Sequence, residues 1–465
     1  MLKIKFGTDG WRAIIAQEYT VQNVARVTEA VSIWLKKSHK NPSIVIGHDC
    51  RFGGALFTET AIKVFCNNGI KVFTPKTFVS TPMISFGVLT YKANQGVVIT
   101  ASHNPPSYNG YKLKGAHGGP TPPAQITEVE ELIPDVEVNI VGDLAEYAKV
   151  GLLEYVDLEK EYEDYICSKF DIEKLNLSPF KMAYDAMFGA GQTVMARLFP
   201  KAVLLHCEEN PSFKGIAPEP LHKNLLELSE TIKQTPELKF GLANDGDADR
   251  IALYDEDGKY IDSHHIILLL IHYLHKYKNL TGKVAIAAST TLRVNKLCAM
   301  YNLPCEVTPI GFKYISQIMM HEDVLVGGEE SGGISVKGHI PERDGIYDGL
   351  VIYEFMNATG KSLKELCREI YDIIGEFFYE RADLHLQESE KQRVITQCNN
   401  GISAFGKYNV VATNLIDGYK YELPNDCWTM IRASGTEPLL RIYAEGNTNE
   451  EVMDILKEVR AVLGV

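Results

Sequence analysis

In the segment VVITASHNPPSYNGYK (97–112), a short apolar run is followed by polar residues with catalytic potential. Ser102 closes the apolar run, and a serine hydroxyl becomes a good nucleophile only when a base or a metal ion activates it. His103 and Lys112 are candidate general acids or bases, provided that the fold brings them close to the serine. The Asn109-Gly110 pair is typical of a turn and predicts that the chain brings Lys112 back. A solvated polar turn is the alternative interpretation.

Three aspartates alternate with small residues in the segment NDGDADR (244–250), at Asp245, Asp247 and Asp249. Hard carboxylate oxygens at this spacing suit Mg²⁺ or Ca²⁺, and the three charges would repel one another without a cation. An EF-hand is disfavoured because Arg250 stands where its sharp turn requires glycine. The following IALYDEDGKYID alternates around an Asp-Gly turn, which predicts a hairpin and not an exiting helix. A solvated acidic turn stays open as the alternative.

The segment LVGGEESGG (325–333) ends an apolar strand with two glutamates and a serine among glycines. Carboxylates accept hydrogen bonds from sugar hydroxyls, and a serine can donate or accept. We therefore expect Glu329, Glu330 and Ser331, on an exposed and flexible backbone, to suit a polyol. A surface turn is equally compatible with this motif alone.

Two arginine-containing segments could contact phosphate. MIRASGTEPLLRIYAEG (430–446) predicts a loop between two strands, with Arg441 on the second strand and four candidate phosphate-binding residues in the loop: Arg432, Ser434, Gly435 and Thr436. Guanidinium, hydroxyl and glycine N–H groups bind phosphate well, although the Walker A frame is absent. A hairpin whose arginines form surface ion pairs is the alternative. Near the start, KFGTDGWRA places Arg12 on a glycine-rich loop, where a plain turn is the simpler interpretation.

Alternating strands and helices must position these loops. Apolar strands at 43–49, 71–75 and 96–100 alternate with a helix around 57–66, which indicates an α/β layer fold. The alternation restarts after Val156 and after Asp262. Beyond about Gly375 the pattern changes to strands around one helix and a final helix, for which Thr448 and Glu451 predict a capping box. The predicted domains are 1–150, 151–258, 259–372 and 373–465.

Composition limits the classes of partner. The chain has 465 residues, 45% hydrophobic and 23% charged, and its length predicts three or four domains. A net charge of -13 disfavours nucleic acid and anionic membranes as partners. No apolar run is long enough to span a membrane, and IILLLI (266–271) predicts a core helix. The N-terminal segment lacks the apolar stretch of a signal peptide, and nine cysteines without CxxC spacing favour reduced thiols in the cytoplasm.

Taken together, FGTDGWR, TASHNP, DGDADR, GEESGG and RASGTEP resemble the motifs of one family, the α-D-phosphohexomutases, in its order and approximate spacing. The motifs run from residue 6 to residue 438, so the resemblance covers nearly the whole chain. It implies four domains around a central cleft: three similar α/β domains with mixed sheets, and a smaller C-terminal α+β domain. It also implies an enzyme that carries a phosphoryl group on serine.

The resemblance implies roles for the residues at matching positions. Phosphoryl transfer would fall to Ser102 as carrier, Lys112 as acid or base, alone or with His103, and the nearby Arg12 and Arg250. Mg²⁺ would be bound by a phosphate oxygen on Ser102 together with Asp245, Asp247 and Asp249. The substrate would contact Lys313, Glu329, Ser331, Arg432, Ser434, Gly435, Thr436 and Arg441. A hexose 1,6-bisphosphate would serve as intermediate and activator, and the protein would be a monomer or homodimer.

The sugar loop bears on substrate identity. Family members that act on both mannose and glucose phosphates often read GEMSGH, and glucosamine enzymes often read GEQSGH, whereas Gly333 replaces the histidine here. Phosphoglucomutase-like members often read GEESFG, which is closer to GEESGG. We therefore expect glucose 1-phosphate and glucose 6-phosphate, with mannose phosphates second and amino-sugar phosphates third. A non-catalytic phosphosugar-binding paralogue and a serine phosphatase are the alternatives from other classes.

Overall fold

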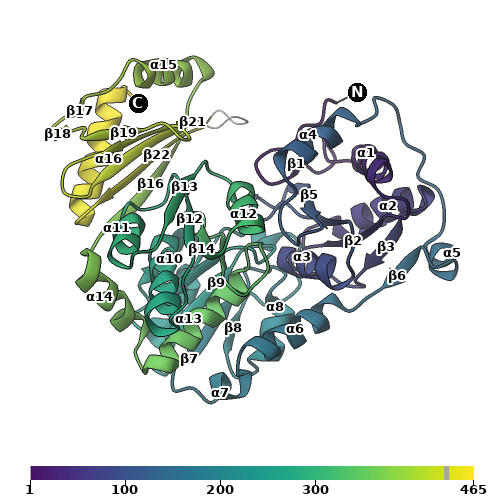
Figure 1. Cartoon of the computed structure of the whole chain (residues 1–465), viewed down its shortest axis with the longest axis horizontal. Helices are drawn as coiled ribbons and strands as arrows, with labels where there is room; N and C mark the ends of the chain where they lie inside the picture. The colour runs from purple at the N-terminus through teal and green to yellow at the C-terminus, as the bar shows by residue number, and fades with distance from the viewer. Residues whose placement is uncertain (1, 434–438) are drawn as a thin grey trace.

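The computed structural model describes residues 2–433 and 439–465, which form four successive domains, each built around one main sheet (Figure 1). The N-terminal domain lies at the right of Figure 1 and the C-terminal domain at the upper left. The first three sheets are mixed and the fourth is antiparallel. The predicted fold class is therefore confirmed.

The first sheet has the order β1-β5-β4-β2-β3-β6. Its strands are β1 (Trp11–Ile14), β2 (Ser43–His48), β3 (Lys71–Thr74), β4 (Gln95–Ile99), β5 (Tyr108–Gly115) and β6 (Leu153–Tyr155). The accompanying helices are α1 (Val21–Ser38), α2 (Gly54–Asn67), α3 (Thr81–Thr90), α4 (Pro123–Glu131) and α5 (Leu144–Lys149). Strands β4, β2, β3 and β6 run parallel, whereas β5 returns antiparallel beside β4.

The second sheet has the order β11-β10-β9-β7-β8. Its strands are β7 (Lys181–Asp185), β8 (Val203–Leu205), β9 (Leu238–Asn244), β10 (Ile251–Tyr254) and β11 (Tyr260–Ile261). The helices are α6 (Leu158–Lys169), α7 (Ile172–Asn176), α8 (Gln192–Leu198) and α9 (Leu226–Gln234), with short turns η1 (Phe213–Gly215) and η2 (His222–Asn224). The antiparallel β10–β11 pair is the hairpin predicted after the acidic loop, so the EF-hand is excluded.

The third sheet has the order β13-β12-β14-β15. Its strands are β12 (Lys283–Ala287), β13 (Cys305–Thr308), β14 (Val324–Gly328) and β15 (Ile334–Val336). The helices are α10 (Ser263–His272), η3 (Tyr273–Tyr277), α11 (Arg293–Met300), α12 (Phe312–His321), α13 (Gly345–Thr359) and α14 (Leu363–Ile374). Every residue of α10 is buried, which confirms that IILLLI belongs to a core helix.

The fourth sheet has the order β16-β22-β21-β20-β19 and is covered by the last helix. Its strands are β16 (Phe378–His385), β19 (Ala412–Asn414), β20 (Tyr419–Glu422), β21 (Trp428–Ala433) and β22 (Leu439–Gly446). A small pair, β17 (Ala404–Phe405) and β18 (Tyr408–Asn409), and helices α15 (Glu388–Asn399) and α16 (Asn449–Leu463) complete the domain. Thr448 caps α16 as predicted, but the Glu451 carboxylate accepts from the Asn447 N–H instead of completing the capping box.

Four of the five predicted site motifs lie between antiparallel neighbours. The serine segment joins β4 to β5, the acidic segment joins β9 to β10, and the glutamate segment joins β14 to β15. The segment between β21 and β22 is the fourth. In the first three sheets each motif follows a strand that also pairs in parallel with another, so its residues leave the carboxyl end of that strand.

The hydrophobic core is continuous across the first three sheets. One cluster of buried side chains includes Val45 and Val98 of the first sheet, Phe240 of the second and Val326 of the third. The fourth domain has its own cluster around Ile442 and α16. The first three domains thus form one packed body, to which the fourth is joined by a separate small cluster around Trp428.

One turn prediction is wrong. Asn109 and Gly110 lie inside β5, paired with β1 on one side, and do not form a turn. The chain reverses earlier, between Ile99 and Tyr108, because the serine segment itself supplies the connection. A Cβ at Gly110 would lie 2.5 Å from the Thr100 carbonyl oxygen, so this glycine permits close strand approach.

The cysteines are unpaired and mostly buried. All nine are free, and six of them are buried: Cys50, Cys66, Cys298, Cys367, Cys398 and Cys427. Within residues 2–433 and 439–465, no helix combines the length and the apolar character needed to cross a membrane.

Candidate active site

The serine segment is held in a strained conformation by a buried arginine. Ser102 has a φ of 51°, in the left-handed region that non-glycine residues rarely adopt. The Arg51 guanidinium donates to the carbonyl oxygens of Ser102, Asn104, Pro105 and Tyr108. Because the same side chain also pairs with the buried Asp49, the backbone around the serine has little freedom to relax.

The hydroxyl of Ser102 faces the acidic segment of the second domain. Ser102 Oγ donates to Asp245 Oδ2 over 2.7 Å, and His103 Nδ1 lies 3.3 Å from the same serine oxygen. The serine residue is only 1% exposed. A Cβ at Gly246 would lie 2.7 Å from the Ser102 carbonyl oxygen, so glycine allows the two segments to meet. The fold thus brings together motifs that are 143 residues apart.

The three aspartates form one buried group. Asp245, Asp247 and Asp249 each offer a carboxylate oxygen, and these oxygens lie within 4.8 Å of one another. Thr81, at the start of α3, donates its hydroxyl to Asp247 and its N–H to the Asp247 carbonyl oxygen. The first domain therefore fixes the acidic segment from a second direction.

Lys112 and Arg343 form ion pairs with two members of this group, Asp247 and Asp249. Lys112 Nζ lies 2.8 Å from Asp247 Oδ2, 2.9 Å from Asp249 Oδ2 and 2.9 Å from Asp9 Oδ2. Arg343 Nη2 lies 2.6 Å from Asp249 Oδ2 and 2.5 Å from Asp9 Oδ2. Lys112 comes from the first domain, Asp249 from the second and Arg343 from the third. All three domains therefore meet in this ion network.

The donor set fits a hard divalent cation. The second carboxylate oxygens, Asp247 Oδ1 and Asp249 Oδ1, are buried and have no hydrogen-bond partner. A buried carboxylate oxygen without a partner is costly, and Mg²⁺ prefers carboxylate oxygens as ligands. The residues present therefore match the predicted Mg²⁺ site, with two orphaned oxygens and the Asp245 carboxylate as its ligands.

The electrostatics of the cluster are strongly shifted. Burial, reinforced by the neighbouring Asp247 and Asp249, raises the pKa of Asp245 well above its usual value. Burial also favours the neutral form of Lys112, but the carboxylates of Asp247, Asp249 and Asp9 outweigh it and raise the pKa of the lysine. Burial and the nearby cation of Arg250 hold the pKa of His103 well below its usual value. Repulsion from Asp247 and Asp249 thus adds to the effect of burial on the pKa of Asp245.

The remaining predicted catalytic residues border the serine. Arg12 lies in β1 and not on a loop, and its Nη1 donates to Asn104 Oδ1 over 2.7 Å. Arg250 Nη2 lies 3.5 Å from His103 Nε2, and its Nε lies 3.9 Å from Asp245 Oδ2. These two guanidinium groups thus contact different residues of the serine segment, Asn104 and His103.

The glutamate segment is less exposed than expected. Glu329 is 5% exposed, and its Oε1 accepts from the Gly311 N–H over 2.8 Å. Burial raises the pKa of Glu329 to about 7. Ser331 is half-buried, as is Lys313 in the first turn of α12. The prediction of an exposed backbone here is wrong because the third domain packs Gly332 against the Ile251 backbone.

The predicted phosphate-binding residues belong to the fourth domain. Arg432 lies in β21 and not in the loop, directly opposite Arg441 in β22. Arg432 pairs with Asp417, and Arg441 Nε lies 3.7 Å from Asp383 Oδ1. Ser434, Gly435 and Thr436 lie outside the described residues. Among the residues that are described, no hydrogen bond or ion pair joins Arg432 or Arg441 to the serine cluster.

Sequence reasoning missed several members of the network. Arg343 and the buried pair Lys114–Glu342, 2.6 Å apart, lie next to the cluster, and Ser85 Oγ donates to Glu342. Lys114 is two residues from Lys112, so both lysines point to the same face of β5. The charged run Glu342-Arg343-Asp344, placed just before α13, was the available signal for the third domain.

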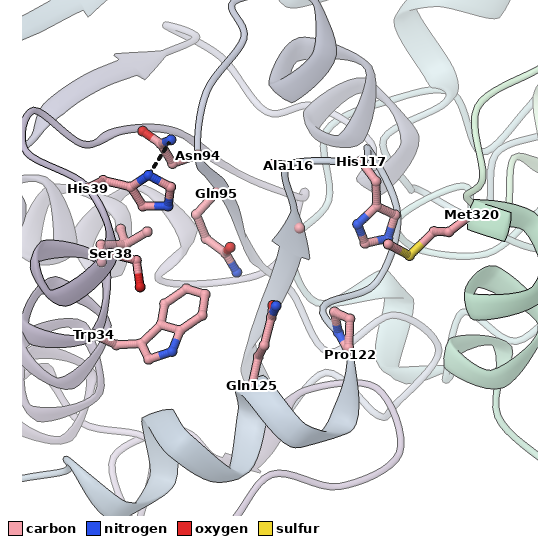
Figure 2. A pocket seen from close by; sticks show the side chains of 12 residues that line it. Trp34, Ser38, His39, Asn94, Gln95, Ala116, His117, Pro122, Gln125 and Met320 are labelled. Atoms are coloured by element: carbon pink, nitrogen blue, oxygen red, sulfur yellow. Dashed lines mark hydrogen bonds between the residues drawn. The ribbon is translucent and has the colours of Figure 1, made fainter.

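A separate pocket of about 370 Å³ lies at the end of β5 and does not include these residues (Figure 2). Trp34 comes from α1 and His39 directly follows that helix, whereas Gln125 comes from α4 and Met320 from α12 of the third domain. None of its lining side chains is a carboxylate or a lysine or arginine cation. The clustered charged groups are instead in the buried network, which is therefore the candidate site.

Four family models match successive parts of the chain. They are the phosphoglucomutase/phosphomannomutase alpha/beta/alpha domains I, II and III, at residues 3–139, 160–258 and 262–373, and the corresponding C-terminal domain at residues 392–462. Together they cover most of the chain in the expected order.

Individual proteins match along nearly the full length. A phosphoglucomutase/phosphomannomutase of Thermococcus kodakarensis is 27% identical, covering 97% of this chain and 96% of that protein. A phosphoglucosamine/phosphogalactosamine mutase of Sulfurisphaera tokodaii is 27% identical, covering 98% of both. A solved structure described as a "putative phosphomannomutase" of Thermus thermophilus is 30% identical, with a TM-score of 0.88 and complete coverage of both chains.

Proposed function

The chain belongs to the phosphoglucomutase/phosphomannomutase family of α-D-phosphohexomutases, and from that premise we propose that it interconverts glucose 1-phosphate and glucose 6-phosphate through a phosphorylated Ser102. The observation that carries the proposal is the 2.7 Å contact between Ser102 Oγ and Asp245 Oδ2, inside a group of three aspartates. The serine lies beside three carboxylates that could bind a metal ion, and Arg12, Lys112 and Arg250 surround it. This arrangement suits phosphoryl transfer, which depends on positioning and charge stabilisation.

The proposed reaction conserves phosphate. The bond between phosphorus and Ser102 Oγ breaks as a new bond forms to the free hydroxyl of the sugar phosphate. That hydroxyl passes its proton to the unprotonated His103, or to Lys112, which must first lose its own proton because its carboxylate partners hold it as an ammonium. The resulting hexose 1,6-bisphosphate turns over in the site. Its other phosphoryl group then moves to Ser102 Oγ, and the sugar oxygen left behind takes up a proton. No inorganic phosphate is released.

The cofactor proposal follows from the donor set. Mg²⁺ held by Asp245, Asp247, Asp249 and a phosphate oxygen on Ser102 would supply positive charge to the transferring group. Asp247 Oδ1 and Asp249 Oδ1, buried without partners, are the atoms best suited to it. Lys112 and Arg343 would retain the remaining carboxylate oxygens. A hexose 1,6-bisphosphate is proposed as the activator.

Substrate recognition is proposed to combine two domains. Glu329 and Ser331, with Lys313, would contact the sugar, because carboxylate and hydroxyl oxygens accept from sugar hydroxyls. Arg432 and Arg441, side by side on neighbouring strands, would hold the phosphate that is not reacting. Ser434, Gly435 and Thr436 are proposed to join them. The same phosphate contacts would then serve both orientations of the bisphosphate.

The choice of glucose rests on GEESGG and is the finer part of the proposal. Mannose phosphates are the second candidate. Amino-sugar phosphates stay a candidate because the similar Sulfurisphaera tokodaii protein is named a phosphoglucosamine/phosphogalactosamine mutase. We further propose a cytoplasmic enzyme, monomeric or dimeric, with domain boundaries near residues 150, 258 and 372. A non-catalytic phosphosugar-binding protein is the competing class.

Phosphorus NMR tests the proposal directly. Glucose 1-phosphate, mannose 1-phosphate and glucosamine 1-phosphate are incubated separately with the protein, Mg²⁺ and a trace of the matching 1,6-bisphosphate. We expect a 6-phosphate signal to grow fastest with glucose, and to be absent with Ser102→Ala. Intact mass should show about 80 Da of phosphoryl mass on the wild type that Ser102→Ala lacks.

The outcomes separate the alternatives. Faster isomerisation of mannose or glucosamine phosphate replaces glucose as the substrate but keeps the mutase. A growing signal of inorganic phosphate indicates a phosphatase. Binding without isomerisation of any sugar, by a protein that contains phosphoserine and Mg²⁺, overturns the mutase and leaves the binding protein.

A further inference from the structure

Asp417 lies where the fourth domain meets the third, in the turn between β19 and β20. Its Oδ1 accepts from Arg432 Nε over 3.0 Å, and its Oδ2 accepts from the backbone N–H of Ile310 over 2.8 Å. Arg432 and Asp417 belong to the fourth domain, whereas Ile310 belongs to the third. One carboxylate therefore orients the arginine and also ties it to a neighbouring domain.

The backbone that hydrogen-bonds Asp417 also hydrogen-bonds the segment 325–333, which contains Glu329. The N–H of Gly311, the next residue after Ile310, donates to Glu329 Oε1 over 2.8 Å. Gly311 has a φ of 132°, and a Cβ there would lie 2.8 Å from Thr8 Cγ2 of the first domain. Adjacent backbone amides thus bind carboxylates from two different domains. Only one peptide unit separates the Arg432–Asp417 pair from Glu329.

We propose that Asp417 is a positioning residue that fixes the Arg432 guanidinium relative to the sugar-binding segment around Glu329. This inference rests on the proposed function, in which Arg432 holds the non-reacting phosphate and Glu329 contacts the sugar. A hexose phosphate has a fixed distance between its phosphate and its ring hydroxyls. The two protein groups that hold these ends must therefore keep a fixed separation, and the Asp417–Ile310 hydrogen bond connects them.

The pair stays accessible to a ligand while it is held. The Arg432 side chain is 20% exposed and the Asp417 side chain 23% exposed. The guanidinium uses Nε, and more weakly Nη2 at 3.5 Å, for Asp417, so the charge is oriented without being enclosed. A bidentate arginine needs such orientation to match a phosphate group.

The Asp417–Ile310 hydrogen bond also makes the position of Arg432 depend on contact between the third and fourth domains. Movement of the fourth domain away from the third would keep the Asp417–Arg432 pair but would break the bond from the Ile310 N–H. Other contacts in the same interface do not involve Arg432 or Asp417, among them Lys420 Nζ with the carbonyl oxygens of Ala288 and Thr290. Asp417 thus links this interface directly to Arg432, the proposed phosphate-binding residue.

A kinetic cycle tests this role. The variants are Asp417→Asn, Arg432→Gln and the double variant, assayed with glucose 1-phosphate, Mg²⁺ and glucose 1,6-bisphosphate. The non-reacting phosphate is held equally in ground and transition states, so its loss raises KM and changes kcat little. We expect Asp417→Asn to raise KM about tenfold with kcat within about twofold of the wild type. Added to Arg432→Gln, it should change KM by less than about twofold.

The matched control is Asp426→Asn. Asp426 also pairs across the same domain interface, with Lys296 Nζ at 2.9 Å, but it is exposed and does not contact Arg432. We expect this control to leave KM unchanged. Hydrogen exchange at the Ile310 amide provides a readout independent of turnover, and Asp417→Ala should accelerate it whereas Asp426→Asn should not.

Several results would overturn the inference. They are an unchanged KM in Asp417→Asn, an equal rise in KM with and without Arg432, or a lowered melting temperature alone, which would indicate a merely structural turn. If the wild type isomerises no hexose phosphate, the proposed function fails separately. Calorimetric binding of glucose 6-phosphate to the wild type and the three variants then judges Asp417, and absence of binding to the wild type overturns both.

Discussion

The side chain of Arg343 fills the space that any side chain at residue 333 would require. A Cβ built on Gly333 would lie 2.4 Å from Arg343 Cδ and 3.1 Å from its Cγ. The far end of the arginine is held by Asp9 and Asp249 and cannot move freely. Glycine at residue 333, where a histidine is absent, therefore leaves the space in which Arg343 reaches Asp249 of the three-aspartate group.

Replacing Gly333 by alanine should displace Arg343. We expect Gly333→Ala to lower stability by about 1–3 kcal/mol, as in other overpacked sites, and to lower kcat at least tenfold by separating the guanidinium from Asp249. Thermal unfolding and mutase kinetics measure the two effects. Shortening the arginine should relieve the clash, so Gly333→Ala is expected to cost less stability in an Arg343→Ala background than in the wild type. Equal costs in both backgrounds would show that the contact is unimportant.

Magnesium should stabilise the protein by relieving repulsion among the aspartates. At a Mg²⁺ concentration about 100 times its Kd, linkage gives about 2.7 kcal/mol, which should raise the melting temperature by about 3 °C or more. Asp245→Asn should abolish this rise, and without metal it should be at least as stable as the wild type. Differential scanning calorimetry with Mg²⁺ or EDTA measures both. A metal-independent melting temperature in the wild type would contradict the site.

Glu329 should give the protein a specific dependence on pH. Burial raises its folded-state pKa to about 7, so the folded protein binds this proton more tightly than the unfolded chain. Stability from this group is therefore fully present below its unfolded pKa of about 4.3 and is lost as pH rises through about 7, by up to about 3 kcal/mol. Glu329→Gln should gain stability relative to the wild type between about pH 5 and pH 8 in urea unfolding. A difference that is the same at both pH values would argue against a buried, neutral Glu329.

Arg51 should be essential for the serine segment although it contacts no reacting atom. Lysine cannot reproduce its donation to the carbonyl oxygens of Ser102, Asn104, Pro105 and Tyr108. We expect Arg51→Lys to lose about 2–4 kcal/mol of stability and to lower kcat about 100-fold, because buried acceptors are left unpaired. Arg197→Lys, on an exposed arginine of α8, is the matched control and should have little effect.

Local patterns predicted the frame of the molecule, and long-range pairing decided the rest. Strands such as 181–185 and the buried helix at 266–271 were readable because their apolar periodicity matches their burial. Asn109-Gly110 misled because pairing with β1 overrides its turn preference. Arg343, Lys114 and Asp417 were missed since their importance arises from partners in other domains, and no local spacing signals such a pair. Arg432 was predicted in the loop, whereas it lies in β21, because that strand continues to Ala433.

The continuous core of the first three domains has a consequence for how the chain comes apart. Val45, Phe240 and Val326 belong to one apolar cluster, so heating should disrupt these sheets together in a single cooperative step. The fourth domain, with its separate core around Ile442, can melt or be clipped from the remainder as an independent calorimetric unit. A truncated chain ending near residue 375 would then keep the serine and its aspartates in place while losing the domain that contains Arg432 and Arg441.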